Sequence, residues 1–352
     1  MTKRFISLLF VAAAPLFGQQ QTTEPFKAKV DVSLVLLDAV VTDNRGNQIL
    51  GLGKDDFVVR ENGIPQSIES VDYFTTRKLL NAPEKNAAFN VERVHDERYL
   101  IYFFDKPNGG GVVDPTRNAR YELARYLQDH MHPEDRIAVV GHDVRLKVYS
   151  DFSGDRKTVL HGLDEAMLFG RGLMSASDGS ATGASILRNI DIGRMINNTN
   201  TQYEALEVLA DALRPLRARK DLVLFSPGIV APDEDVRGEM IVSTSRFYEP
   251  AIQSLNRANV TIYGINLFDA SMNPPEYVHQ NLSRLSMETN GDYFRFHTSF
   301  ATPLKQIEKR TVGYYMITYR PQKPKRGYNP VEVTLKNPEF RVHARAGYSS
   351  GE

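Results

Sequence analysis

The sequence predicts an α/β fold: a doubly wound, mostly parallel sheet with helices on both faces, inserted in or flanked by a β-sandwich. Short continuous apolar runs at Tyr99–Phe104, Asp221–Ser226 and Val260–Ile265 alternate with helix-patterned segments. Such runs are typical of strands buried on both faces, and their alternation with helices indicates a parallel sheet. The two ends of the chain, residues 26–75 and 313–349, have β patterns instead.

Further elements of the middle region follow from the same patterns. Strands are expected at 136–142, 144–152 and 293–296, and helices at about 115–131, from 155, and at 202–218, 243–258, 276–289 and 300–312. Asp114 followed by Pro115 suits a helix N-cap and first helical position. Residues 169–201 form a Gly-, Ser- and Asn-rich insertion with one helix expected near 184–196. A loop of this length inside a domain is usually functional.

The terminal β segments are expected to pack together. Asn62-Gly63 separates two β-patterned runs and predicts a tight hairpin, because both residues accept positive φ. Residues 76–96 lose periodicity and are interpreted as a linker. The simplest architecture pairs 26–75 with 313–349 around an α/β domain at 97–312, since domain insertions are tolerated where chain ends lie close together. Two independent β modules are the alternative.

The first residues predict an export signal. Lys3 and Arg4 precede an apolar run at 5–17, and small Gly18 precedes a glutamine run. This is the layout of a signal peptide at residues 1–18, with cleavage after Gly18. The apolar run is shorter than the roughly 20 residues that span a bilayer, and no later segment is long and apolar enough. We therefore expect a periplasmic, cell-surface or secreted protein, with an uncleaved anchor as the alternative.

Composition excludes several function classes. Lys plus Arg and Asp plus Glu are 43 each, so the formal net charge is zero. Nucleic-acid binders normally carry a basic excess that neutralises phosphate, so we expect no nucleic-acid partner. The chain has no cysteine, which excludes disulfides, thiolate metal sites and cysteine nucleophiles.

Several segments together resemble a known family. They are the β opening from Val30, YLIYFFD, HPEDRIAVVGH, RKDLVLFSPG, ANVTIYGINL and the closing GYYMITYRP, VEVTLKNPEF and RVHARAGY. Their order resembles a von Willebrand factor A-type (vWA) domain, and more closely the VWFA-related domain family of Acidobacterial secreted proteins. The resemblance covers roughly residues 30–349. It implies a divalent-cation site at the C-terminal edge of the sheet, built from Asp-x-Ser-x-Ser, a threonine and an aspartate on three loops.

The residues at these positions predict a degenerate metal site. Asp105 matches the first ligand, but Pro107 and Gly109 replace the two serines, and Pro227 stands where an aspartate is expected. Mg²⁺ prefers an octahedron of hard oxygen ligands, which Pro and Gly side chains cannot supply. We therefore expect no metal or other cofactor. The alternative is a Mg²⁺ or Mn²⁺ site.

The side chains considered for binding at this edge are few. If a metal binds, the matching residues leave Asp105 and Thr201 as its ligands, with Thr199 a weaker substitute for Thr201. Otherwise Asp105 is a structural carboxylate that accepts backbone N–H bonds. The expected binding surface consists of Asp105, Asn108, Asp114, Thr201 and Ser226.

Two motifs near this edge are not expected to be catalytic. Ser226 ends a strand, as the serine of a nucleophile elbow does, but the preceding glycine is absent and Pro227 lacks the N–H of an oxyanion hole. Gly109–Gly111 lacks the lysine of a phosphate-binding loop. His142 and Asp143 are expected near the sheet edge without forming a site by themselves.

We therefore expect an exported, non-catalytic protein-binding module, an adhesion or scaffold protein, rather than an enzyme. It would contact another protein through loops at 105–114, 169–201 and 226–242. A cation-dependent adhesin using Asp105 and Thr201 is the second hypothesis, and an uncharacterised hydrolase is the third. The sequence does not identify the partner.

Overall fold

The structure is a computed structural model. It describes residues 34–75, 97–106, 115–168, 170–174, 183–216, 218–229, 246–267, 276–295, 297, 299–323 and 325–350. The signal peptide expected at 1–18 and the linker expected at 76–96 fall outside these ranges. The described residues belong to one compact unit.

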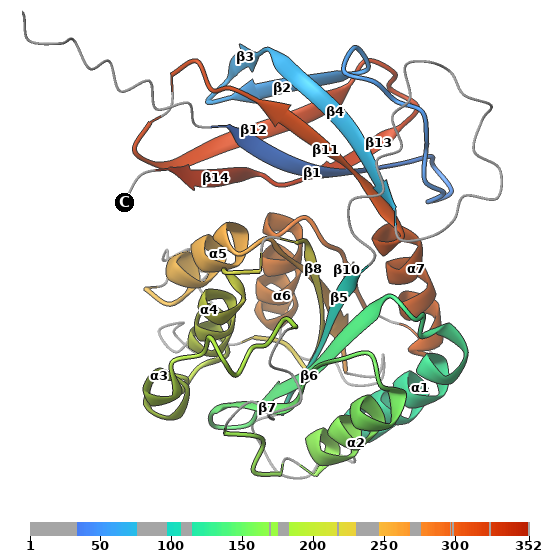
Figure 1. Cartoon of the computed structure of the whole chain (residues 1–352), viewed down its shortest axis with the longest axis vertical. Helices are drawn as coiled ribbons and strands as arrows, with labels where there is room; N and C mark the ends of the chain where they lie inside the picture. The colour runs from blue at the N-terminus through green and yellow to red at the C-terminus, as the bar shows by residue number, and fades with distance from the viewer. Residues whose placement is uncertain are drawn as a thin grey trace, which may run out of the picture. The chain divides into compact units, whose positions relative to one another are not determined.

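A six-stranded sheet organises the middle of the chain (Figure 1), in the order β10-β9-β8-β5-β6-β7. Its strands are β5 (Arg98–Asp105), β6 (Asp135–His142), β7 (Leu146–Ser153), β8 (Lys220–Ser226), β9 (Val260–Asn266) and β10 (Tyr293–Phe294). All neighbouring pairs are parallel except β6 and β7. Only three residues connect β6 to β7, too few for the crossover that a parallel pair needs, so β7 turns back as an antiparallel edge strand. The predicted mostly parallel sheet is therefore confirmed.

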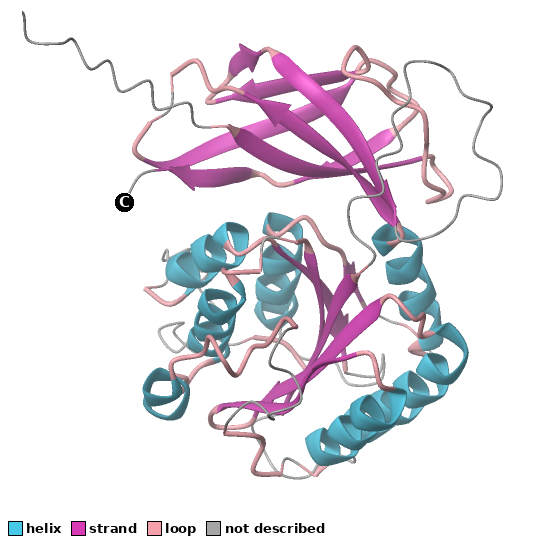
Figure 2. Cartoon of the chain, in the orientation of Figure 1, coloured by secondary structure: helices cyan, strands magenta, loops and turns pink. Residues whose placement is uncertain are grey.

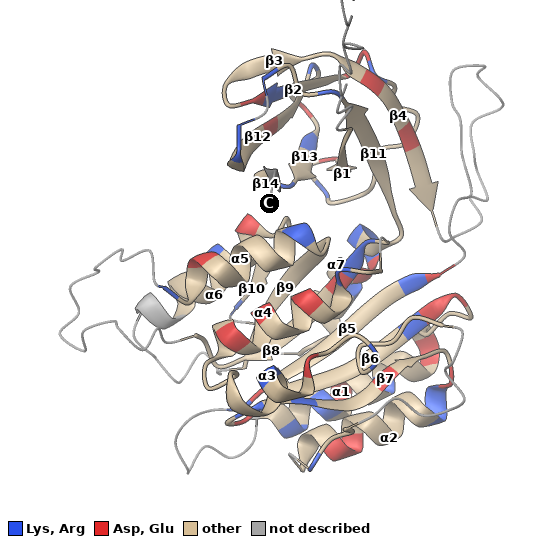
Figure 3. Cartoon of the chain, turned by 60° about the vertical axis from the view of Figure 1, so that its left-hand side comes forward, with Lys and Arg blue, Asp and Glu red and all other residues tan. Residues whose placement is uncertain are grey.

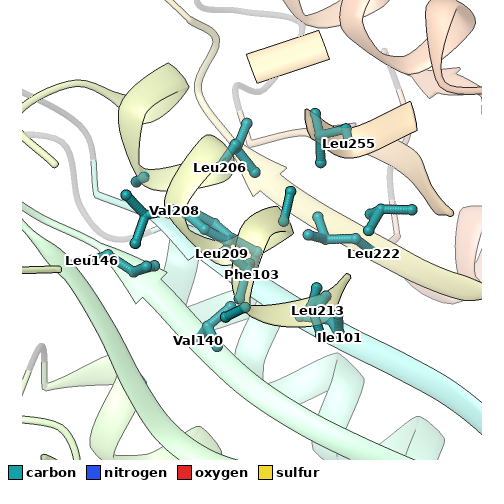
Figure 4. Packing of buried hydrophobic residues seen from close by; sticks show 14 of the residues in the cluster. Ile101, Phe103, Val140, Leu146, Leu206, Val208, Leu209, Leu213, Leu222 and Leu255 are labelled. Carbon is teal, nitrogen blue, oxygen red and sulfur yellow. The ribbon is translucent and has the colours of Figure 1, made fainter. Parts of the chain in front are cut away.

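Within the described residues, seven helices surround this sheet and cover both of its faces (Figure 2). They are α1 (Pro115–His130), α2 (Arg156–Met167), α3 (Ile192–Asn197), α4 (Gln202–Leu213), α5 (Tyr248–Arg257), α6 (Glu276–Glu288) and α7 (Ala301–Thr311). Successive residues of a strand point to opposite faces. Ile101 and Phe103 accordingly pack with α3–α6 (Figure 4), whereas Leu100 and Tyr102 pack with α1, α2 and α7. Both faces of β5 are buried, which explains its continuous apolar sequence.

The insertion after α2 is less helical than predicted. The helix expected at 184–196 is reduced to α3, because the Asp151 carboxylate accepts hydrogen bonds from the backbone N–H groups of Ile186 and Leu187. These bonds compete with helical ones. Asp191 then caps α3 through the N–H of Arg194.

The same insertion covers the outer edge of β7. The N–H of Leu173 donates to Val148 O at 2.6 Å, and the N–H of Leu146 donates to Thr199 Oγ1 at 2.9 Å. An uncovered edge strand presents unpaired backbone groups to other chains. These bonds therefore protect β7 from edge pairing.

Other predicted elements differ at their ends. The helix expected at 202–218 ends at Leu213, the helix expected at 243–258 is described from Tyr248, and the strand expected at 293–296 is described for Tyr293 and Phe294. Element boundaries are the least certain part of a prediction from sequence pattern.

The terminal strands form two four-stranded sheets, β13-β1-β11-β4 and β14-β12-β2-β3. Their bounds are β1 (Val35–Thr42), β2 (Phe57–Glu61), β3 (Ile64–Gln66), β4 (Ile68–Thr75), β11 (Gly313–Tyr319), β12 (Gly327–Leu335), β13 (Arg341–Ala344) and β14 (Gly347–Ser350). Each sheet joins strands from both ends of the chain, as in the pairs Leu37↔Ile317 and Val59↔Val333. These four residues belong to one buried apolar cluster shared by the two sheets.

The predicted hairpin at Asn62-Gly63 is confirmed. Both residues have positive φ, 50° and 78°, and connect the antiparallel strands β2 and β3. Two positive φ angles match the right-handed twist of the strands in a two-residue turn. Asn62 and Gly63 tolerate this conformation better than branched residues would.

Candidate functional site at the C-terminal edge of the sheet

Four strands of the central sheet end in polar residues at one edge. Asp105 ends β5 next to His142 of β6, and Ser226 ends β8 next to Asn266 of β9. All four are at most 3% exposed. Open α/β sheets concentrate their ligand sites at this edge, outside the carboxyl ends of the strands. The chain therefore buries a polar layer under the surface where such sheets bind ligands.

The Asp105 carboxylate is the centre of this layer. Its Oδ2 accepts a hydrogen bond from Ser226 Oγ at 2.7 Å. Gln202, the first residue of α4, lies with Nε2 3.4 and 3.5 Å from the two carboxylate oxygens. A buried carboxylate is costly unless polar donors surround it. Both donors are neutral side chains of this chain.

The hydroxyl of Ser226 both donates and accepts a hydrogen bond. While Ser226 Oγ donates to Asp105, it accepts the N–H of Gly228 at 3.0 Å. Gly228 has φ 127°, a conformation that residues with a side chain rarely adopt. The glycine thus allows the turn after β8 to fold back onto the serine.

His142 closes the layer on the β6 side. Its Nε2 lies 2.9 Å from the carbonyl oxygen of Thr199, and a carbonyl can only accept, so the proton is on Nε2. The other nitrogen, Nδ1, lies 3.6 Å from Asp105 Oδ1, which is beyond hydrogen-bond distance. His142 therefore fills space beside the carboxylate and fixes the loop that carries Thr199.

Of the residues predicted for the binding surface, the structure brings together Asp105 and Ser226. Thr201 instead is the N-cap of α4: its Oγ1 accepts the N–H of Glu204, while Glu204 Oε2 accepts the N–H of Thr201 at 2.9 Å. Asn108 and Asp114 lie outside the described residues.

Thr199, the weaker candidate, is also engaged. Its hydroxyl donates to Met195 O and accepts the N–H of Leu146. The hydrogen bonds described for Asp105 come from the side chains of Ser226 and Gln202 rather than from backbone N–H groups.

Sequence reasoning missed Gln202 and the contact with His142. The position of His142 at the end of a predicted strand placed it near this edge, but no signal linked it to Asp105. Nothing in the pattern marked Gln202, because its reach to Asp105 depends on where α4 begins.

The described residues of this layer supply few of the ligands that the cation site implied by the vWA resemblance needs. Within the described residues, no three His, Cys, Asp or Glu side chains are grouped so that they could hold a metal. Among the described residues of the layer, Asp105 is the single carboxylate, and its oxygens lie within reach of the donors of Ser226 and Gln202. Mg²⁺ takes oxygen ligands in near-ideal octahedral geometry, and the imidazole of His142 beside Asp105 offers only nitrogen.

Acidic and basic residues are mixed over the helices around the sheet (Figure 3). Among the described helices, none combines the length and the apolar character required to cross a membrane.

No protein-family profile and no curated protein sequence matches this chain. Solved structures give distant likenesses. An aerotolerance-related membrane protein from Bacteroides fragilis is 10% identical, with 61% of this chain and 98% of that chain covered at a TM-score of 0.37. The conserved hypothetical protein BatB from Bacteroides thetaiotaomicron is 12% identical, with 60% and 98% covered at a TM-score of 0.35. The human COPII-coat protein Sec24c is 10% identical, with 73% and 44% covered at a TM-score of 0.39. These likenesses are too distant to indicate a function.

Proposed function

We propose that this chain is an exported, non-catalytic protein-binding module of vWA type whose metal site is degenerate. In this proposal the α/β unit is inserted in a β-sandwich of the terminal strands. The observation that carries it is the Asp105 carboxylate, which is fully buried and hydrogen-bonded by Ser226 and Gln202. A-type domains expose a cation at this position for a partner's carboxylate. Here the neutral side chains of Ser226 and Gln202 donate hydrogen bonds to the aspartate, so the partner binds without a metal.

Two exposed apolar side chains near the β6 end of the polar layer support a protein partner. Val144 is 65% and Ile196 44% exposed. Two hydrogen bonds, from Leu146 N to Thr199 Oγ1 and from Arg145 Nη1 to Asn200 Oδ1, hold the β6–β7 turn against the segment after α3. The turn carries Val144 and α3 carries Ile196. Apolar groups that gather on a surface are typical of interaction sites.

The chemistry of Ser226 supports a role other than catalysis. A serine nucleophile needs a base that removes its proton and a position from which it can reach substrate. The Ser226 proton points to a carboxylate at the centre of the polar layer, and the side chain is fully buried. A hydrolase would have to use other residues.

The metal question is tested by calorimetry. Mg²⁺ or Mn²⁺ is titrated into the mature chain and into the variants Asp105→Asn and Thr201→Ala. The proposal predicts no binding heat in any of the three proteins. Binding by the wild type that both variants lose would identify the cation-dependent adhesin instead.

The binding surface is tested by crosslinking in the native envelope fraction. The variant Val144→Ser/Ile196→Ser is compared with Met287→Ser, which removes an equally exposed apolar side chain (62%) near the end of α6. We expect a reproducible crosslinked protein to be lost only in the double variant and to persist when EDTA is present. Equal crosslinking by all three proteins would place the contact elsewhere.

A further inference from the structure

A groove lies between α6 and β10, the strand at one edge of the central sheet. Its volume is about 380 Å³, which is within the range of small-ligand pockets. Steps of four residues place the side chains that α6 contributes on one face of the helix. The groove is lined by His279, Gln280, Ser283 and Met287 of α6, by Tyr293 of β10 and by Arg295 just after it.

His279 is the buried part of this lining, with 5% of the residue exposed. Its Nδ1 lies 2.7 Å from Tyr293 Oη and 3.2 Å from Asn266 Nδ2. The amide nitrogen of Asn266 also donates to Pro227 O at 3.4 Å. Because an amide nitrogen can only donate, Nδ1 is an acceptor, and the proton of the neutral ring is assigned to Nε2. The contacts of Nδ1 therefore fix the ring, which offers a donor through Nε2.

The groove is positively charged. None of its described lining residues is acidic, and Arg295 carries its one full charge. The acidic residues that flank this part of the chain are held elsewhere: Glu288 accepts from Arg284 Nε at 2.6 Å, and Asp292 pairs with Arg310. The polar groups that line the groove are thus suited to an anionic ligand.

Two other grooves of similar volume have a different character. The one between α4 and α5, of about 390 Å³, is lined by Glu207 and Asp211 among others. The one between α1 and α7, of about 440 Å³, is lined by Glu122 and Asp129 among others. Carboxylates in the walls repel an anion, so the groove beside β10 is the best suited of the three to bind one.

We propose that the groove between α6 and β10 binds a small monocarboxylate that has an apolar body. A guanidinium presents two parallel N–H groups to a carboxylate, which assigns the carboxylate to Arg295. The hydroxyl of Ser283 and the imidazole of His279 are the further donors in the same groove.

The apolar body of the ligand packs on Met287 and on the ring of Tyr293. Met287 is 62% exposed, and its unbranched thioether adapts to differently shaped apolar groups. The site uses neither Asp105 nor the surface of Val144 and Ile196, so it is independent of the proposed function.

A pair of probes tests the proposal on the full chain. The acid 3-phenylpropionate and its neutral amide, 3-phenylpropanamide, have nearly the same shape and differ in charge. In ligand-detected NMR titrations we expect the acid to bind saturably, with a dissociation constant of about 1 mM or lower. The amide should bind at least about tenfold more weakly, because it loses the charge-assisted bonds to the guanidinium. Equal affinities, or no saturable binding of the acid up to about 10 mM, would overturn the proposal.

Matched variants test the residues. Gln280→Glu adds a like charge to the groove and should weaken acid binding at least about tenfold, whereas Gln128→Glu, at an equally exposed glutamine of α1, should not. Arg295→Gln should weaken it as well, whereas Arg136→Gln, at an arginine paired with Glu97, should leave it unchanged. The unfolding temperature of each variant shows that it is folded. Acid binding that persists in Gln280→Glu or in Arg295→Gln would contradict the assignment.

Discussion

Ser226 donates its hydroxyl proton to Asp105 at 2.7 Å, between the ends of two neighbouring parallel strands, and both side chains are fully buried. This contact gives the buried carboxylate of Asp105 a hydrogen-bond donor from the chain itself. The hydrogen bond therefore links the stability of this edge to Asp105, the residue that the resemblance matches to the first metal ligand.

The first prediction concerns that bond. Ser226→Ala leaves a buried carboxylate oxygen without its hydroxyl donor, so we expect the free energy of unfolding to fall by about 1.5–3 kcal/mol. Denaturant unfolding at neutral pH measures the change. Ser283→Ala on α6 is the control and should change the stability by less than about 0.5 kcal/mol. Equal effects of both variants would show that the bond contributes nothing.

The second prediction separates capping from metal binding at Thr201. Thr201→Ala removes one half of the capping box with Glu204, which is expected to cost about 1 kcal/mol of stability. The loss should be the same with Mg²⁺ and with EDTA. If Mg²⁺ stabilises the wild type but not Thr201→Ala, the threonine is a ligand after all.

Much of this architecture could be predicted from residue patterns. Apolar runs such as Tyr99–Phe104 identify strands because burial on both faces requires them, and Asn62-Gly63 identifies its hairpin through backbone chemistry. The position of Asp105 and Ser226 at strand ends placed both at one edge, where they do meet.

The features that the sequence did not predict depend on contacts between residues far apart in the chain, which no local pattern contains. Gln202 contacts Asp105 only because α4 begins beside β5. Asp151 shortens the predicted helix near residue 190 by binding backbone groups more than thirty residues away. The pairing of Asp38 with Arg345 joins the two ends of the chain, and neither residue stands out in its own segment.

The third prediction concerns acid stability. Desolvation by burial, together with the positive charges of Arg310 and Arg341, lowers the pKa of His343 from 6.5 to about 4. As the pH falls, His343 is therefore protonated near pH 6.5 in the unfolded chain but only near pH 4 in the folded chain. Stability must fall as the pH decreases through this window. His343→Gln should flatten the pH dependence of the unfolding temperature, whereas His161→Gln, an exposed control on α2, should not.

The fourth prediction concerns the stability of the chain at alkaline pH. Desolvation by burial and the nearby positive charge of Arg345, partly opposed by Asp38, lower the pKa of Lys220 from 10.5 to about 7. Between pH 7 and 10.5 the unfolded chain holds a proton that the folded chain has released. The free energy of unfolding should therefore rise with pH across this range, by no more than about 5 kcal/mol.

Lys220→Met tests this assignment. The variant keeps the length of the side chain and removes the titrating amine, so its stability should no longer rise between pH 7 and 9. Lys336→Met in the loop after β12 is the control and should rise like the wild type. A rise that persists in Lys220→Met would mean that another group releases the proton, and Lys220 would then be an ordinary charged lysine bound to the end of α4 through Leu213 O.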